Sequence, residues 1–174
     1  MKLNQLIVIM LCLIIFCSFN VKAEPELNHI HYSLSGGDTD IESIKLIANY
    51  QFDQTNGSDL HLSYGDNDLK LEGYWVLNFY NENNSKLNLE LGLANCINGN
   101  KFGKAIGFSY EGVYLNQNNY FLNCKYFIEK DSKLILNGGL SVPLVPSTRL
   151  TLGMGNSYWS QSKYLFNLGI KVDL

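Results

Sequence analysis

The chain has 174 residues, with 13 basic and 16 acidic side chains and a formal net charge of −3 at pH 7. This length suits a single domain. The mildly acidic balance excludes the basic surface on which nucleic-acid binding depends, so no nucleic-acid partner is expected.

The first 23 residues have the layout of an export signal. Lys2 supplies a positive charge, residues 6–19 are almost entirely apolar, and Val21-Lys22-Ala23 ends in the pattern that signal peptidase accepts. We expect a signal peptide at 1–23 and a single domain at 24–174, in which 11 basic residues face 16 acidic ones. An uncleaved anchor is the alternative, but the apolar run is shorter than the roughly 20 residues of a spanning helix.

The rest of the chain alternates between apolar and polar residues with a period of two, which predicts strands with two different faces. Turn-forming residues separate the alternating runs, for example at 143–147. In chain order, strands are predicted near residues 27–34, 43–52, 59–64, 68–80, 86–95, 103–115, 119–129, 133–142, 148–155 and 163–174.

Ten strands fit an all-β fold, a single antiparallel up-and-down transmembrane β-barrel. An even number brings both ends of the chain to one side of a membrane. Eight strands remain the alternative, if the runs at 59–64 and 68–80 rearrange or if the first run only leads into the barrel. In either case a closed barrel requires the first and last strands to pair, because lipid cannot satisfy an open strand edge.

Alternation alone does not decide whether the apolar face points inward or toward lipid. The opposite face is rich in glycine, alanine, serine and asparagine, which suits a narrow interior better than a water-exposed surface. Aromatic residues also lie near strand ends, as at a membrane–water interface. They are Tyr80, Tyr114, Tyr120, Tyr158, Trp159 and Tyr164.

The last eight residues resemble the C-terminal insertion signal of bacterial outer-membrane proteins. The residues that carry the resemblance are Asn167, Gly169, Val172 and Leu174. The signal usually ends in an aromatic residue, so Leu174 departs from the pattern. The resemblance implies a protein of the Gram-negative outer membrane that meets the barrel-assembly machinery during insertion.

A second resemblance lies in the middle of the chain. A glycine-rich strand at 103–107 leads through a polar turn to an aromatic strand at 118–121. This order is loosely similar to the YfaZ-type proteins among small outer-membrane barrels. That resemblance implies an outer-membrane protein without a known catalytic role.

Eight charged residues and one asparagine in the polar phase of the strands are predicted to line the lumen. The candidates are Lys45, Lys70, Glu72, Glu90, Glu111, Lys125, Asn137, Arg149 and Lys171. They would form either a charged pore or an internal ion-pair network that fills a narrow barrel.

His29, His31 and Ser33 share one face of the first strand. A histidine two residues before a serine is also the spacing of the outer-membrane lipid A deacylases, in which the pair acts as base and nucleophile. That family carries the pair late in its chain and facing the membrane, so we interpret these residues as lumen lining. A metal site would need His61 as a third ligand, on a strand that need not adjoin the first. We therefore expect no catalytic residues, no metal and no cofactor.

Cys96 and Cys124 are the cysteines outside the signal. They are predicted on strands separated by one further strand, which places them ~10 Å apart and beyond disulfide reach. We interpret both as small hydrophobic residues.

The leading hypothesis is a monomeric outer-membrane barrel with a structural or interaction role, in contact with membrane lipid and lipopolysaccharide. Three alternatives stay open. They are a narrow porin-like channel for small solutes, a lipid-modifying enzyme that uses His31 and Ser33, and a secreted soluble barrel that binds an apolar ligand.

Overall fold

The computed structural model describes residues 26–37, 41–65, 68–82, 85–97, 101–114, 117–128, 132–156 and 164–174. The predicted signal peptide at 1–23 lies outside the described residues, as do Tyr158 and Trp159 of the predicted aromatic set. Among the residues described, no helix is long and apolar enough to cross a membrane.

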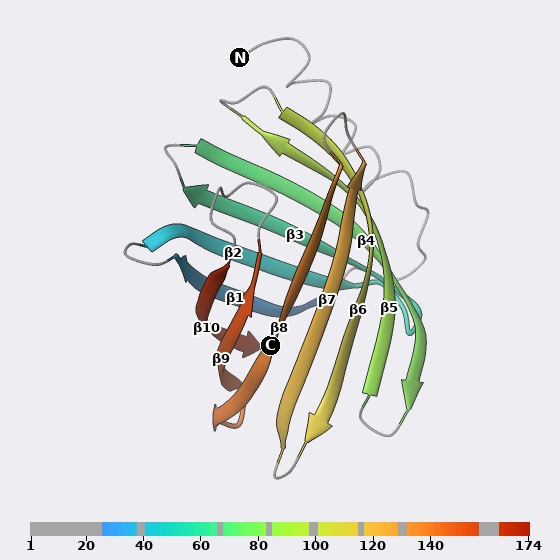
Figure 1. Cartoon of the computed structure of the whole chain (residues 1–174). Helices are drawn as coiled ribbons and strands as arrows, with labels where there is room; N and C mark the ends of the chain where they lie inside the picture. Colours follow the sequence, from blue (N-terminus) through green and yellow to red (C-terminus); the bar gives the residue numbers. More distant parts are fainter. Residues whose placement is uncertain are drawn as a thin grey trace.

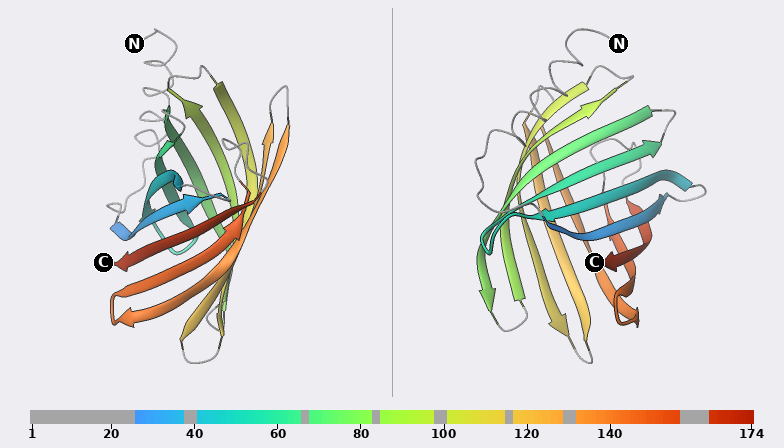
Figure 2. Two further views of the ribbon diagram at one scale, coloured as in Figure 1. Left: turned by 60° about the vertical axis from the view of Figure 1, so that its left-hand side comes forward. Right: turned by 180° about the vertical axis from the view of Figure 1, so that it is seen from behind.

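Ten strands make up the described structure, so the prediction of ten is confirmed and the alternative of eight is wrong. Each strand pairs antiparallel with its neighbours in sequence, in an up-and-down order. Figures 1 and 2 show the result as a tube of tilted strands. Their bounds are β1 Glu26–Gly36, β2 Ile41–Gln51, β3 Asn56–Gly65, β4 Asp68–Glu82, β5 Ser85–Cys96, β6 Lys101–Tyr114, β7 Asn118–Ile128, β8 Lys133–Val145, β9 Thr148–Gly155 and β10 Leu165–Asp173.

The barrel closes between its first and last strands, as the sequence predicts. β1 and β10 pair antiparallel from His29 opposite Asp173 to Gly36 opposite Phe166. In Figure 2 the two strands lie side by side, blue beside dark red. The sheet therefore has no open edge, and the backbone groups that an edge strand would expose are paired.

The apolar face of the sheet is on the outside of the tube. Its exposed side chains include Leu62 on β3, Leu91 on β5, Leu122 on β7 and Leu168 on β10. The polar phase points into the lumen, where Glu72 and Glu90 are buried. This is the predicted orientation, and it is the reverse of a water-soluble barrel, in which the leucines would fill the centre.

A carboxylate organises the turn between β2 and β3. Asp53 Oδ1 accepts hydrogen bonds from the backbone N–H groups of Thr55 and Asn56, at 2.7 and 2.8 Å. The bonds from Thr55 and Asn56 lower the pKa of Asp53 from 3.8 to about 2. This tight turn allows β3 to begin at Asn56, whereas the sequence predicts a longer turn and a strand that begins only at residue 59.

Barrel closure is testable by disulfide trapping between β1 and β10. Leu34 faces Leu168, and paired residues have Cα atoms about 4.5–5.5 Å apart, which a disulfide can span. In a background with Cys96 and Cys124 replaced by alanine, we expect Leu34→Cys/Leu168→Cys to oxidise to an internal disulfide that shifts the mobility of the denatured chain.

The matched control is Leu34→Cys/Leu152→Cys. Leu152 faces Leu168 from β9, so it lies one strand farther from Leu34, ~10 Å across the sheet. Cross-linking of this control pair but not of the test pair would contradict the closed order of strands.

Candidate functional site

A polar cavity occupies the lumen, with a volume of about 880 Å³. We call the end of the barrel where β1 begins and β10 ends the terminal end, and the other end the far end. Asn28 and Asp173 line the cavity at the terminal end, and Ser35 and Leu165 line it at the far end. The cavity therefore extends along the strands rather than occupying a single layer of the barrel.

The structure places almost all of the predicted lumen residues along this cavity. Eight of the nine line it: Lys45, Lys70, Glu72, Glu90, Glu111, Lys125, Asn137 and Lys171. Arg149 differs, because its Nη2 donates to the Gln117 carbonyl in the β6–β7 turn at 2.7 Å and its Nε donates to Ser141 Oγ at 2.9 Å. Arg149 thus connects β9 to β8 and to the β6–β7 turn at the terminal end of the barrel.

Glu72 is the centre of a first polar cluster. The buried carboxylate accepts a hydrogen bond from Tyr74 Oη at 2.9 Å and lies 3.2 Å from His61 Nδ1. Lys45 Nζ lies 3.8 Å from the same oxygen. These partners come from β2, β3 and β4, so the cluster follows the barrel wall.

Glu90 and Lys125 form the shortest ion pair among the described residues. Lys125 Nζ lies 2.7 Å from Glu90 Oε2, and both side chains are buried. Asn123 Nδ2 donates to the other carboxylate oxygen at 3.1 Å. The ammonium group also lies 3.4 Å from the centre of the Tyr74 ring, a cation–π contact that reaches from β7 to β4.

A third ion pair spans the bore. Lys171 Nζ on β10 lies 3.8 Å from Glu111 Oε1 on β6. Three strands separate β10 from β6 along the shorter path around the barrel, and five along the longer one. The two side chains therefore meet across the lumen, and Asn119 Nδ2 holds the Glu111 carboxylate at 2.8 Å.

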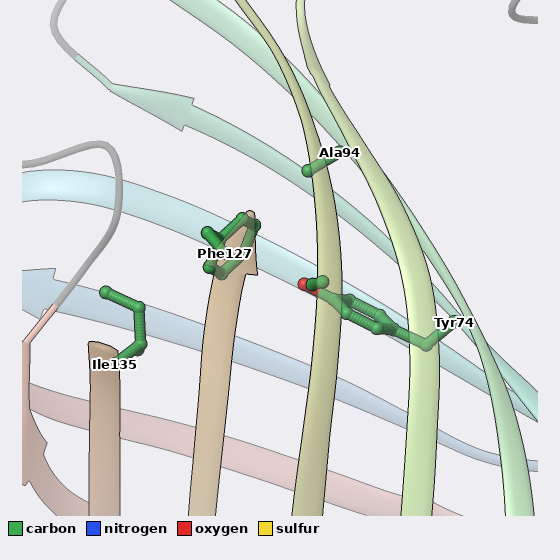
Figure 3. Close-up of a cluster of buried hydrophobic side chains, with 5 residues drawn as sticks. Tyr74, Ala94, Phe127 and Ile135 are labelled. Carbon is green, nitrogen blue, oxygen red and sulfur yellow. The ribbon is translucent and has the colours of Figure 1, made fainter. Parts of the chain in front are cut away.

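Apolar side chains narrow the lumen in its far half. Tyr74, Ala94, Ala105, Phe127 and Ile135 form a buried cluster. Figure 3 shows four of them on different strands, with the Tyr74 ring extending from β4 toward Phe127. This cluster was not predicted from the sequence. Its large members, Tyr74, Phe127 and Ile135, occupy positions where the alternation predicts polar residues. Large apolar residues at such positions indicate apolar contacts inside the barrel.

The first-strand histidines and Ser33 also face the lumen. His31 Nε2 lies 2.8 Å from Thr151 Oγ1 on β9, so this nitrogen is hydrogen-bonded to Thr151. His61 lies on β3, with β2 between it and β1, and its Nδ1 is bound to Glu72. Within the described residues, no three histidine, cysteine or acidic side chains are arranged to hold a metal ion.

Among the described residues, Cys96 and Cys124 form no disulfide with each other. Cys124 is half-buried among exposed apolar side chains, since Phe108 and Leu136 face it from the two neighbouring strands. Cys96 is buried, and its thiol lies 3.2 Å from Asp68 Oδ2. Cys96 is thus held by a polar contact rather than serving only as a small hydrophobic residue.

No protein-family model matches the chain, and no curated protein sequence matches it. Among solved structures, a KdgM porin superposes with a TM-score of 0.59 at 10% identity, over 84% of this chain and 99% of that one. A KdgM porin in complex with disordered oligogalacturonate gives a TM-score of 0.58 at 11% identity, with the same coverage. The chain therefore has the fold of these porins.

The Glu90–Lys125 pair gives a prediction about stability. Glu90→Gln leaves the Lys125 ammonium group buried without its counter-ion, and loss of one partner of a buried pair costs up to about 3–5 kcal/mol. We expect a lower urea midpoint for unfolding from detergent micelles. Glu90→Gln/Lys125→Met removes both charges and should recover most of the loss. An equal loss in the single and double variants would contradict the assignment.

Proposed function

We propose that the chain is an outer-membrane barrel through which small hydrophilic solutes pass. The observation that carries the proposal is the polar cavity of about 880 Å³, which is lined by residues at both ends of the strands. Such an interior is what a channel needs, since a solute that leaves bulk water keeps hydrogen-bonding partners along its path. The porin fold supports the same function.

The exterior supports a membrane location. The outward side chains are mainly leucine, isoleucine, phenylalanine and tyrosine, and a belt of this kind on a soluble protein would promote aggregation. Tyr80, Tyr114 and Tyr120 are exposed near the terminal end, where tyrosines suit a membrane–water interface. The closed sheet supplies the complete backbone hydrogen bonding that lipid demands.

The remaining assignments follow from this location. The terminal end would face the periplasm, because both chain ends of a bacterial barrel lie there. Residues 1–23 would direct export, and the motif at Asn167, Gly169, Val172 and Leu174 would meet the assembly machinery. The partners would be membrane lipid and lipopolysaccharide around a monomer. The similarity to the YfaZ-type proteins at 103–107 and 118–121 stays a prediction.

A closed barrel with a structural or interaction role is the second candidate. The observation in its favour is the set of contacts across the lumen, the Lys171–Glu111 pair and the Tyr74 cluster, which reduce the bore. A soluble barrel and a lipid hydrolase have less support. A soluble barrel would not expose its leucines, and a lipid hydrolase would not turn Ser33 toward the lumen and away from lipid.

Conductance separates the channel from the closed barrel. We expect the purified protein, in planar lipid bilayers, to give discrete steps that are smaller than those of wide trimeric porins, because the lumen contacts leave a narrow path. The control is the same preparation after irreversible heat unfolding. Bilayers that contain folded protein, verified by heat-modifiable gel mobility, and that still show no steps would contradict the channel and favour the closed barrel.

The membrane location predicts a depth-dependent cost for an outward charge. Leu122 is exposed at the middle of β7, and Leu144 is exposed next to the end of β8. An arginine on the lipid face costs about 2–4 kcal/mol at the membrane centre and about 0–1 kcal/mol near the interface. We expect Leu122→Arg to lower the yield of folded protein in vesicles far more than Leu144→Arg does. Equal tolerance of both would count against lipid around the barrel.

A further inference from the structure

The lumen contains matched charges rather than an excess of one sign. Its lysines are Lys45, Lys70, Lys86, Lys125 and Lys171, and its carboxylates are Asp59, Glu72, Glu82, Glu90, Glu111 and Asp173. Five cations against six anions leave almost no net charge to attract one sign of ion. Three of the lysines pair with glutamates, at 2.7 Å for Lys125–Glu90 and 3.8 Å for Lys45–Glu72 and Lys171–Glu111.

The Lys171–Glu111 pair is the one of the three that crosses the lumen. The other two pairs follow the wall, because β2 and β4, and likewise β5 and β7, are each separated by a single strand. Lys171 and Glu111 instead meet across the bore, and their side chains are 17% and 34% exposed. A solute in the lumen can therefore reach both groups, and one that passes between β6 and β10 separates or displaces them.

The free energy of that separation depends on the charge of the solute. A neutral solute separates the ammonium and carboxylate groups and gives neither a charged partner. An anion satisfies Lys171 and leaves Glu111 with only the amide of Asn119 as a partner. A cation satisfies Glu111 and leaves Lys171 with the Asp173 carboxylate, whose Oδ1 lies 4.0 Å from Lys171 Nζ. Removing one partner of an ion pair at low exposure is destabilising because the other charge is then less well compensated. A solute that carries both an ammonium and a carboxylate group replaces both partners at once.

We propose that the lumen preferentially passes small zwitterionic solutes, such as amino acids, by exchange of ion-pair partners at Lys171 and Glu111; this rests on the channel function proposed above. Lys171 receives the solute carboxylate and Glu111 receives its ammonium group. Asn119 keeps Glu111 in place during the exchange. Two buried atoms along the same cavity, His29 Nδ1 and Asn88 Oδ1, have no hydrogen-bond partner among the described residues and offer further hydrogen bonds to the solute.

Two isomers of the same size provide the test. Alanine is a zwitterion and lactamide is neutral, although both contain the same atoms. Their entry into liposomes that contain the full mature chain is followed by swelling, and the rate into protein-free liposomes is subtracted. We expect alanine to enter the wild-type proteoliposomes about threefold faster than lactamide, a ratio equivalent to a barrier difference of about 0.7 kcal/mol.

Variants connect the preference to the pair. Glu111→Gln/Lys171→Met removes both charges and should bring the two rates together. Glu111→Lys/Lys171→Glu, combined with Asp173→Asn because Asp173 Oδ1 lies 4.0 Å from Lys171 Nζ, exchanges the partners, keeps an ion pair across the bore and should keep the preference. Lys104→Met is the matched control, because Lys104 is exposed on the outward face of β6, the strand of Glu111.

Each result has a distinct meaning. Faster entry of alanine that disappears only in the neutral double variant supports the inference. Equal entry of both isomers into wild-type proteoliposomes overturns the inference and leaves the channel standing. A preference that persists in the folded neutral double variant overturns the assignment to Lys171 and Glu111. Protein-dependent entry of neither isomer overturns the channel itself.

Discussion

Complete pairing of the backbone is the constraint on which the rest of this structure depends. A strand in lipid has no water to satisfy its N–H and C=O groups, so every strand needs two neighbours. The antiparallel pairing of β1 with β10 meets this need for the first and last strands of the chain. Once the sheet is closed, each strand has one face toward the lumen, and the alternation of side chains divides the strand residues between the outer face and the interior.

The lumen is small, so charged residues that are buried in it need partners within the barrel. Glu72 and Glu90 are buried, so each requires partners of opposite charge or hydrogen-bond donors. Tyr74, His61 and Lys45 surround Glu72, while Lys125 and Asn123 hold Glu90. The interior therefore combines many ionised groups with a net charge close to zero.

Sequence periodicity predicted the strands and their faces because both follow from local geometry. It also placed Glu111 and Lys171 in the lumen. It did not predict that they meet, because the strands that face each other across a barrel depend on the number and stagger of all the strands. The same limit explains the missed cluster of Tyr74, Phe127 and Ile135. Each is an apolar residue in the polar phase of its own strand, and only the closed tube brings the three together.

A filled barrel and an open channel can share the same architecture and differ in the free energy needed to separate the contacts across the bore. Contacts across the bore stabilise the interior and also obstruct it, so the permeability of the lumen depends on how easily those contacts exchange partners. The Tyr74 cluster is mainly apolar, although Tyr74 Oη donates to Glu72, and it sets a steric limit. The Lys171–Glu111 pair can exchange its partners with a solute of matching charges, because both side chains are partly exposed to the cavity. An ion pair across the bore is therefore compatible with passage of the solutes that reproduce it.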